Sequence, residues 1–252
     1  MSIDSVEGKV VFISGASRGI GAGLAASYAD LGMKLVLSAR SRPALAESDA
    51  VLSRQVDVRD EAGVEKIVLE AEARFGAIDL WINNAGILEP MKPVRDVSVE
   101  AFREHIDINL TGVFIGTRAF VRHRRRVASQ VGPGGVLINV SSGAAWHAYH
   151  GWGAYCAGKA AVERLTEVVA EEEAGTGLRV HAVAPGVIDT GMQDLIRSAE
   201  VADFAQVERF REMKRDEAFN SVGYVADEFL AIAFDPARRP DSVGVRLENE
   251  KK

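Results

Sequence analysis

The sequence is poor in the residues from which disulfides and metal sites are built. It contains one cysteine, Cys156, so an internal disulfide cannot form and a reducing cytoplasm is the expected location. Its five histidines are scattered without the spacing of a metal site. No apolar run approaches the roughly 20 residues of a membrane helix, and the first residues lack the apolar core of a secretory signal. We therefore expect a cytoplasmic protein that binds neither metal nor membrane.

An excess of basic charge is also missing. The formal net charge is −6, whereas proteins that bind nucleic acid need a basic surface. The run RHRRR at 122–126 lies near the end of a predicted long helix and is interpreted as a solvated or interface face, paired with Glu171–Glu173 on another long helix. A hydrophobic content of 47% in 252 residues suits one large α/β domain, spanning 1–252.

Apolar runs alternate with helical patterns along the chain. Continuous apolar character in such runs is typical of a parallel sheet that is covered on both faces. We predict a doubly wound parallel sheet (a Rossmann fold) of about seven strands, which would bind its ligand at the carboxyl ends of the strands. The strands are expected at 9–14, 34–39, 54–58, 79–86, 134–142 and 178–186, and the helices at 61–76, 98–127 and 153–174.

A glycine-rich turn follows the first predicted strand. Residues 15–21 read GASRGIG and open a helical pattern. Glycine allows a tight turn and a close approach of backbone to a pyrophosphate, and the N-terminus of the helix attracts the anion. The spacing is G-x-x-x-G-x-G, which differs from the common G-x-G-x-x-G fingerprint. This context predicts a dinucleotide site.

Tyr155 and Lys159 share one helix face in the segment YCAGK. Such a pair alone is compatible with ordinary packing. Combined with the glycine turn and with NNAG at 83–86, however, it resembles the short-chain dehydrogenase/reductase family in its single-domain form, from about residue 8 to 192. The segments SSGAAWHAYHGWGAY and APGVIDTGMQ resemble the subgroup that contains sepiapterin reductases and bacterial benzil reductases.

The resemblance implies a catalytic tetrad. Tyr155 would donate a proton to the substrate oxygen, and the Lys159 cation would lower the pKa of Tyr155. Ser142, thirteen residues before Tyr155, would hydrogen-bond that oxygen, with Ser141 the less suitable candidate. Asn109 would hold a water that connects Lys159 to solvent.

The resemblance also implies a nicotinamide cofactor. Members that use NAD carry an acid at the end of the second strand, where this chain has Ala39 followed by Arg40, with Arg42 close by. A guanidinium can bind a 2′-phosphate, so NADP(H) is favoured over NAD(H). The expected cofactor-binding residues are Gly15, Ser17, Arg18, Gly19, Ile20, Gly21, Arg40, Asp57, Val58, Asn84, Ala85, Gly86, Tyr155, Lys159, Pro185, Gly186, Ile188 and Thr190. Among them Asp57 would bind the adenine amino group, and Thr190 the carboxamide.

Aromatic residues crowd the loop between Ser142 and Tyr155. They either line a pocket for a planar carbonyl compound or pack the loop onto the core or a partner subunit. The expected pocket residues are Trp146, His147, Tyr149, Trp152 and Met192. Residues 191–222 occupy the family's position for a mobile substrate lid. A pterin substrate is disfavoured, because the C-terminal segment RPDSVGVRLENE offers no clear match to the pterin-binding aspartate of sepiapterin reductases, with Glu248 only nearby.

The sequence favours an NADPH-dependent reductase of an aromatic or planar ketone or diketone. A protein that senses NADP(H) without turnover is the alternative, which the intact tetrad disfavours. The expected partners are a small carbonyl substrate and further copies of the chain, as a homodimer or homotetramer formed through the two long helices.

Overall fold

Seven parallel strands form one sheet in the computed structural model, which describes residues 6–251. Their order is β3-β2-β1-β4-β5-β6-β7, so the winding reverses between β1 and β4. This reversal is the point where a doubly wound sheet binds its ligand. The strands are β1 (Val10–Ser14), β2 (Lys34–Ala39), β3 (Val51–Gln55), β4 (Leu80–Asn83), β5 (Val136–Val140), β6 (Arg179–Ala184) and β7 (Gly244–Arg246).

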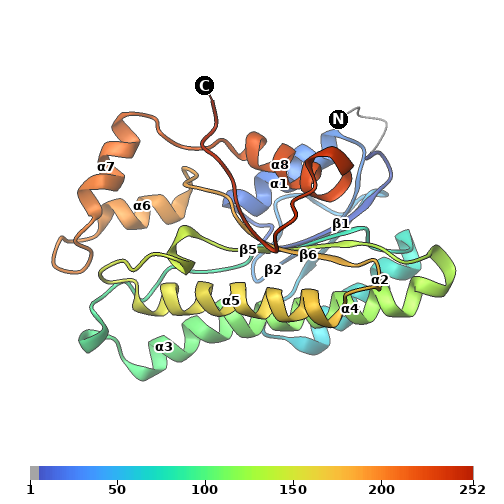
Figure 1. Cartoon of the computed structure of the whole chain (residues 1–252), viewed down its shortest axis with the longest axis horizontal. Helices are drawn as coiled ribbons and strands as arrows, with labels where there is room; N and C mark the ends of the chain where they lie inside the picture. Colours follow the sequence, from blue (N-terminus) through green and yellow to red (C-terminus); the bar gives the residue numbers. More distant parts are fainter. Residues whose placement is uncertain (1–5, 252) are drawn as a thin grey trace.

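Helices cover both faces of the sheet (Figure 1). One face carries α1 (Gly19–Asp30) and α8 (Val222–Phe234), and the other carries α2 (Glu61–Phe75), α4 (Gly112–Val131) and α5 (Gly153–Glu172). Successive side chains of a strand point to opposite faces. In β1, Val11 and Ile13 accordingly join the core beneath α1 and α8, while Val10 and Phe12 join the second core. The doubly wound fold predicted from the sequence is confirmed.

The remaining helices lie near the carboxyl edge of the sheet. They are α3 (Val99–Ile106), a single π-helical turn (Asp107–Thr111) that continues into α4, and the pair α6 (Gly191–Ser198) and α7 (Val207–Arg215). Figure 1 shows α6 and α7 standing away from the sheet, beyond the start of α5. The helix expected at 98–127 is thus three consecutive pieces, and the expected helical segment 191–222 contains two helices joined by a turn.

A buried polar ladder fixes β4 and β5 against the helices. The Asn83 Nδ2 donates to Asn139 Oδ1 at 2.8 Å, and the Asn139 Nδ2 donates to Thr166 Oγ1 on α5 at 2.9 Å. Buried polar groups that are fully paired hold one arrangement of neighbouring elements. This ladder therefore fixes α5, which carries Tyr155 and Lys159, against the centre of the sheet.

Two expectations about the chain near β3 were wrong. The third strand spans Val51–Gln55 rather than 54–58, and residues 41–50 form turns and a loop, so a shortened helix, which the resemblance implies at 41–52, is not formed. Ion pairs from Glu47 to Arg54 and Arg74 attach this loop to the sheet and to α2. Because ion pairs to distant residues hold this loop, its conformation could not be read from a local periodicity in the sequence.

The basic run at 122–126 is only partly a solvated face. It lies inside α4, which continues to Val131. His123 and Arg124 are buried, and Arg124 donates to the carbonyl oxygens of Gly134 and Ile78. The exposed Arg125 pairs with Glu173, which was the expected kind of contact between the two long helices.

None of the helices within residues 6–251 combines the length and the apolar character needed to cross a lipid bilayer.

Candidate active site

Two glycines of the glycine-rich turn after β1 leave no room for a side chain. A Cβ placed on Gly15, whose φ is 69°, would lie 2.8 Å from the Cα of Ala85. A Cβ on Gly21 would lie 2.5 Å from the carbonyl oxygen of Gly15. Helix α1 begins at Gly19 without a side-chain cap or an acidic residue in its first turn, so its positive end stays open to an anion. These features fit the pyrophosphate of a dinucleotide.

The strand ends β1 and β4 are joined beside this turn. The Ser14 hydroxyl accepts from the backbone N–H groups of Asn84 and Ala85, and the Asn84 Nδ2 donates to the Ser14 carbonyl oxygen at 2.9 Å. Gly86 then passes so close to Asn109 that a Cβ would lie 2.8 Å from its Oδ1. The NNAG segment therefore connects the glycine turn to the π-helical turn.

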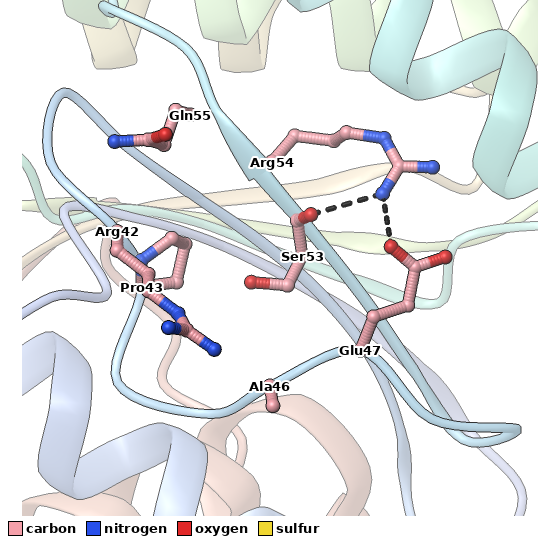
Figure 2. A pocket seen from close by; sticks show the side chains of 7 residues that line it. All are labelled: Arg42, Pro43, Ala46, Glu47, Ser53, Arg54 and Gln55. Carbon is pink, nitrogen blue, oxygen red and sulfur yellow. Dashed lines mark hydrogen bonds and ion pairs between the residues drawn. The ribbon is translucent and has the colours of Figure 1, made fainter.

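Three arginines lie at the outer end of this site. Arg18, Arg40 and Arg42 are exposed, and none forms an ion pair with another residue in the range 6–251. Figure 2 shows Arg42 beside a shallow pocket between the loop after β2 and strand β3, where Arg54 is already bound to Glu47. The unpaired guanidinium groups are available to a phosphate.

Asp57 is engaged with a neighbouring side chain. Its two carboxylate oxygens accept from Arg59, at 3.0 and 2.8 Å, and this guanidinium lowers the pKa of Asp57. Within residues 6–251 the Oδ2 accepts only this one hydrogen bond, so the contact with the adenine amino group expected from the resemblance stays a prediction. The adjacent Val58 packs against Gly112 of α4, where a Cβ would lie 2.6 Å from its side chain.

Helix α5 presents Tyr155 and Lys159 at the carboxyl end of β5. Both side chains are buried, and the Lys159 Nζ donates to the Val140 carbonyl oxygen at 2.7 Å. The Nζ lies 5.8 Å from the centroid of the Tyr155 ring. The pair that was expected from the sequence is therefore at the ligand-binding edge of the sheet.

Burial governs the ionisation of this pair. It lowers the pKa of Lys159 to about 8, against the opposing charge of the Glu163 carboxylate. It raises the pKa of Tyr155, with a hydrogen bond to Ser142 acting in the opposite direction. The net shift is upward because desolvation of the phenolate outweighs the effect of Ser142. The effect of the Lys159 cation on the pKa of Tyr155 stays a prediction. The raised pKa keeps the phenol protonated, as a proton donor must be.

The two serines after β5 have separate environments. Ser142 is half-buried and acts to lower the pKa of the neighbouring Tyr155, and its Oγ accepts from the Ala144 N–H at 3.2 Å. Ser141 is buried next to the Glu163 carboxyl group on the other side. The geometry thus favours Ser142 over Ser141 as the partner of the reacting oxygen.

Asn109 lies in the π-helical turn with its side chain already bound. Its Oδ1 accepts from the Ile87 N–H at 2.8 Å, and its Nδ2 donates to the Ile87 carbonyl oxygen and to His105 Nε2, each at 2.7 Å. Both amide hydrogens are therefore used. A water contact at Asn109, as expected from the resemblance, would therefore have to use the backbone of this turn, and it stays a prediction.

One neighbour of these side chains was not predicted from the sequence. It is His105, whose ring lies beside both Asn109 and Tyr155. The available signal was a histidine one helical turn before Asn109, on the same face of the predicted helix.

The aromatic loop divides into packing and exposed residues. Trp152 is buried and stacks on Phe204, with 4.7 Å between ring centroids, and it also contacts Tyr149 and Phe210. Trp146 and His147 are exposed, and Trp146 extends toward Gly244 on β7. The packing interpretation therefore holds for Trp152.

The apolar cluster beside Tyr155 joins this loop to α6 and α7. Met192 of α6 is half-buried against it, as is Tyr149. The buried members of the apolar cluster are Leu88, Ala144, Trp152, Tyr155, Ile196, Phe204, Val207 and Phe210.

The turn after β6 folds back over the start of α1. Gly186 has a φ of 82°, and a Cβ there would lie 2.6 Å from the Nδ2 of Asn220, which donates to the Pro185 carbonyl oxygen. Ile188 is buried, and Thr190 lies 3.6 Å from the Cβ position of Gly19. These positions suit a turn that closes over a ligand held at α1.

Glu248 is exposed, and its backbone carbonyl oxygen accepts from Asn220 and Tyr224. Among residues 6–251, no group of three or more histidine, cysteine, aspartate or glutamate side chains is arranged to hold a metal ion.

Comparison with known proteins identifies the family. The model of the family described as short chain dehydrogenase matches residues 9–201. Benzil reductase ((S)-benzoin forming) of Bacillus cereus is 34% identical over 233 residues, which are 86% of this chain and 91% of that protein. The enzyme of the same name from Bacillus subtilis is 30% identical over 231 residues, covering 89% and 93%.

A solved structure shows the same architecture over nearly the whole chain. The 3-ketoacyl-(acyl-carrier-protein) reductase from Brucella melitensis, complexed with NADH, is 27% identical with a TM-score of 0.81 and covers 98% of each chain. Together with the match over residues 9–201, these similarities show that the chain belongs to the short-chain dehydrogenase/reductase family, whose members are oxidoreductases that use a nicotinamide cofactor.

Proposed function

We propose that this protein is an NADP(H)-dependent reductase of ketones or diketones. The observation that carries the proposal is the meeting of Tyr155, Ser142 and Lys159 at the carboxyl edge of the sheet, beside the glycine turn. A buried phenol beside a serine hydroxyl can protonate a carbonyl oxygen that the serine also holds.

The protein's own residues have distinct tasks in this reaction. The reduced nicotinamide, when bound, supplies the hydride. Tyr155 donates the proton to the substrate oxygen, and Ser142 hydrogen-bonds that oxygen as its charge develops. Lys159 is held by the Val140 carbonyl oxygen and positions the cofactor ribose. The backbone at Asn109 holds the water that returns a proton toward Lys159.

The arginines support NADP(H) as the cofactor. Arg40 follows β2 at the position where an acid would bind the ribose hydroxyls of NAD, and Arg18 and Arg42 add positive charge nearby. Because all three are unpaired among residues 6–251, a 2′-phosphate would not have to displace existing partners. NAD(H) is the less favoured cofactor, because the chain has Arg40 where a carboxylate would bind the ribose hydroxyls of NAD.

The apolar cluster supports an aromatic or planar carbonyl substrate. Leu88, Ala144, Tyr149 and Met192 surround Tyr155 with apolar surface. Aromatic and thioether side chains suit a flat apolar ligand. The two benzil reductases are relatives whose names describe such a substrate. A pterin is disfavoured, because the segment RPDSVGVRLENE offers no clear match to a pterin-binding aspartate and the exposed Glu248 is only nearby.

The same proposal assigns roles to the remaining segments. Residues 191–222 act as a substrate lid on a single domain that spans 1–252. Copies of the chain pair through α4 and α5, where Phe114 and Val168 are 43% and 44% exposed. Exposed apolar side chains on long helices favour such pairing into a homodimer or homotetramer. The single cysteine favours the cytoplasm.

An NADPH-oxidation screen tests the function. The substrates are benzil, diacetyl-type diketones, sepiapterin, quinones and aryl ketones, with NADH in a parallel series. We expect turnover of aromatic diketones or ketones with NADPH preferred. Binding of NADPH without turnover of any carbonyl compound would contradict the proposal and favour an NADP(H) sensor.

A further inference from the structure

A buried histidine adjoins the proposed tetrad. His105 is 0% exposed and lies on α3, one turn before Asn109. Its ring stands edge-on to Tyr155, with 6.0 Å between the centroids. The same ring limits the approach of α5, because a Cβ on Gly158 would lie 3.4 Å from the His105 Nε2. His105 therefore fills the space between α3, α5 and the π-helical turn.

The hydrogen bonds of His105 define its tautomer. The Nδ1 lies 2.6 Å from the Glu89 carbonyl oxygen, which only accepts, so Nδ1 carries the proton. The Nε2 lies 2.7 Å from the Asn109 Nδ2, whose amide group only donates, so Nε2 accepts. The ring is consequently neutral, with each nitrogen assigned by its partner.

This histidine connects the loop after β4 to the π-helical turn. Glu89 belongs to that loop, and so does Ile87, which exchanges two hydrogen bonds with the Asn109 side chain. Without the His105 Nε2, one Asn109 amide hydrogen would be buried without an acceptor. A buried donor without an acceptor is strongly disfavoured, so the amide would turn or the loop would shift.

We propose that His105 is a positioning residue of the reductase, which holds Asn109 and the loop at 87–89 in place only while its imidazole is neutral. This inference rests on the function proposed above. Protonation would place an Nε2–H group against the Asn109 Nδ2 hydrogens, so two donors would face each other. The π-helical turn and its water contact to Lys159 would then lose their fixed position, and turnover would fall on the acid side.

The surroundings of His105 favour the neutral form near pH 7. Burial lowers the pKa of His105, and the positive charge of Lys159 on α5 acts in the same direction. The backbone bond to Glu89 and the charge of that residue oppose them. Tyr155, the other titratable group that faces the ring, is held neutral by its own burial. The acid-side loss is therefore expected below the ordinary histidine pKa of about 6.5.

Two substitutions separate the effect of losing the Asn109–His105 hydrogen bond from the effect of protonating His105. His105→Gln keeps an acceptor for Asn109 and cannot be protonated, whereas His105→Leu removes the acceptor. We expect His105→Gln to keep kcat near pH 7 within a few-fold and to lose the acid limb of the kcat/KM profile. His105→Leu should lower kcat by roughly tenfold while the NADPH dissociation constant stays nearly unchanged. His181→Gln, at another buried histidine on β6, is the control and should retain the acid limb.

Contrary results are easy to recognise. A His105→Leu enzyme with wild-type kcat, or a His105→Gln enzyme with the wild-type acid limb, would overturn the inference. Folding of each variant is checked by circular dichroism and by NADPH fluorescence titration.

A second readout does not depend on turnover. Since the folded pKa of His105 is lowered, the wild-type protein should lose stability as the pH falls below about 6.5, where only the unfolded chain is readily protonated. The Tm of His105→Gln should fall less over that range. An equal fall of Tm in both proteins would overturn the inference. Failure of the wild-type protein to reduce any carbonyl compound would instead count against the proposed function alone.

Discussion

The indole of Trp152 lies parallel to the ring of Phe204, with 4.7 Å between centroids and 4° between planes. Trp152 immediately precedes helix α5, and Phe204 lies in the turn between α6 and α7. The adjacent Gly151, with a φ of 83°, comes so close to the Asp203 carbonyl oxygen that no Cβ would fit. The proposed lid therefore rests directly on the loop that leads to Tyr155.

Phe204→Leu should loosen this contact with little change in volume. We expect the KM of the carbonyl substrate to rise several-fold while the NADPH dissociation constant stays nearly constant, because the aromatic stack orders the lid and not the glycine turn. The measurements are steady-state kinetics and NADPH fluorescence titration. Phe229→Leu, at a buried position on α8, is the control. An equal rise of KM in both variants would mean that the stack has no special role.

Arg40→Asp should change the cofactor preference. The substitution reverses the charge at the end of β2, so NADPH binding should weaken and NADH use should improve. The ratio of kcat/KM for the two cofactors is the measurement. Arg239→Asp makes the same charge change near β7, at the opposite edge of the sheet, and should leave the ratio unchanged. If Arg40→Asp also keeps the ratio, Arg40 does not recognise the 2′-phosphate.

Glu163→Gln should move the alkaline limb of the kcat/KM profile. Glu163 is buried one turn after Lys159 on α5, and its charge raises the pKa of Lys159, which burial lowers to about 8. Without that charge the pKa of Lys159 falls further, so the lysine loses its proton at lower pH and the limb shifts in that direction. Glu171→Gln, at an exposed position of the same helix, is the control. An unchanged limb in Glu163→Gln would show that Lys159 does not set it.

Features encoded locally in the sequence could be predicted. The apolar runs located β1, β2, β4, β5 and β6, because strands buried on both faces have continuous apolar character. The crowding at Gly15 and Gly21 follows from their place between a strand and a helix. The spacing from Ser142 to Tyr155 likewise predicted that the two residues are neighbours in the fold, where Ser142 acts on the pKa of Tyr155.

Features that depend on distant partners could not be predicted. Trp152 is buried by Phe204, some fifty residues further along the chain. The sequence of its own loop was therefore equally compatible with a packing residue and with a pocket residue. The binding of Asn109 to Ile87 and His105 depends on how the loop after β4 meets the π-helical turn. The effect of burial on Tyr155 also needs the whole fold, because desolvation comes from every element around the ring.

Tyr155→Phe tests the central claim most directly. The substitution removes the proton donor and keeps the buried ring, so the fold and NADPH affinity should be retained. General acid catalysis is typically worth 10²–10⁴-fold, and the rate of NADPH oxidation with the best carbonyl substrate of the screen should fall by roughly that factor. The measurement is the single-turnover rate of both proteins at saturating NADPH, after circular dichroism and fluorescence titration have confirmed folding and binding. A Tyr155→Phe protein that reduces the substrate at nearly the wild-type rate would contradict the assignment of Tyr155 as the proton donor.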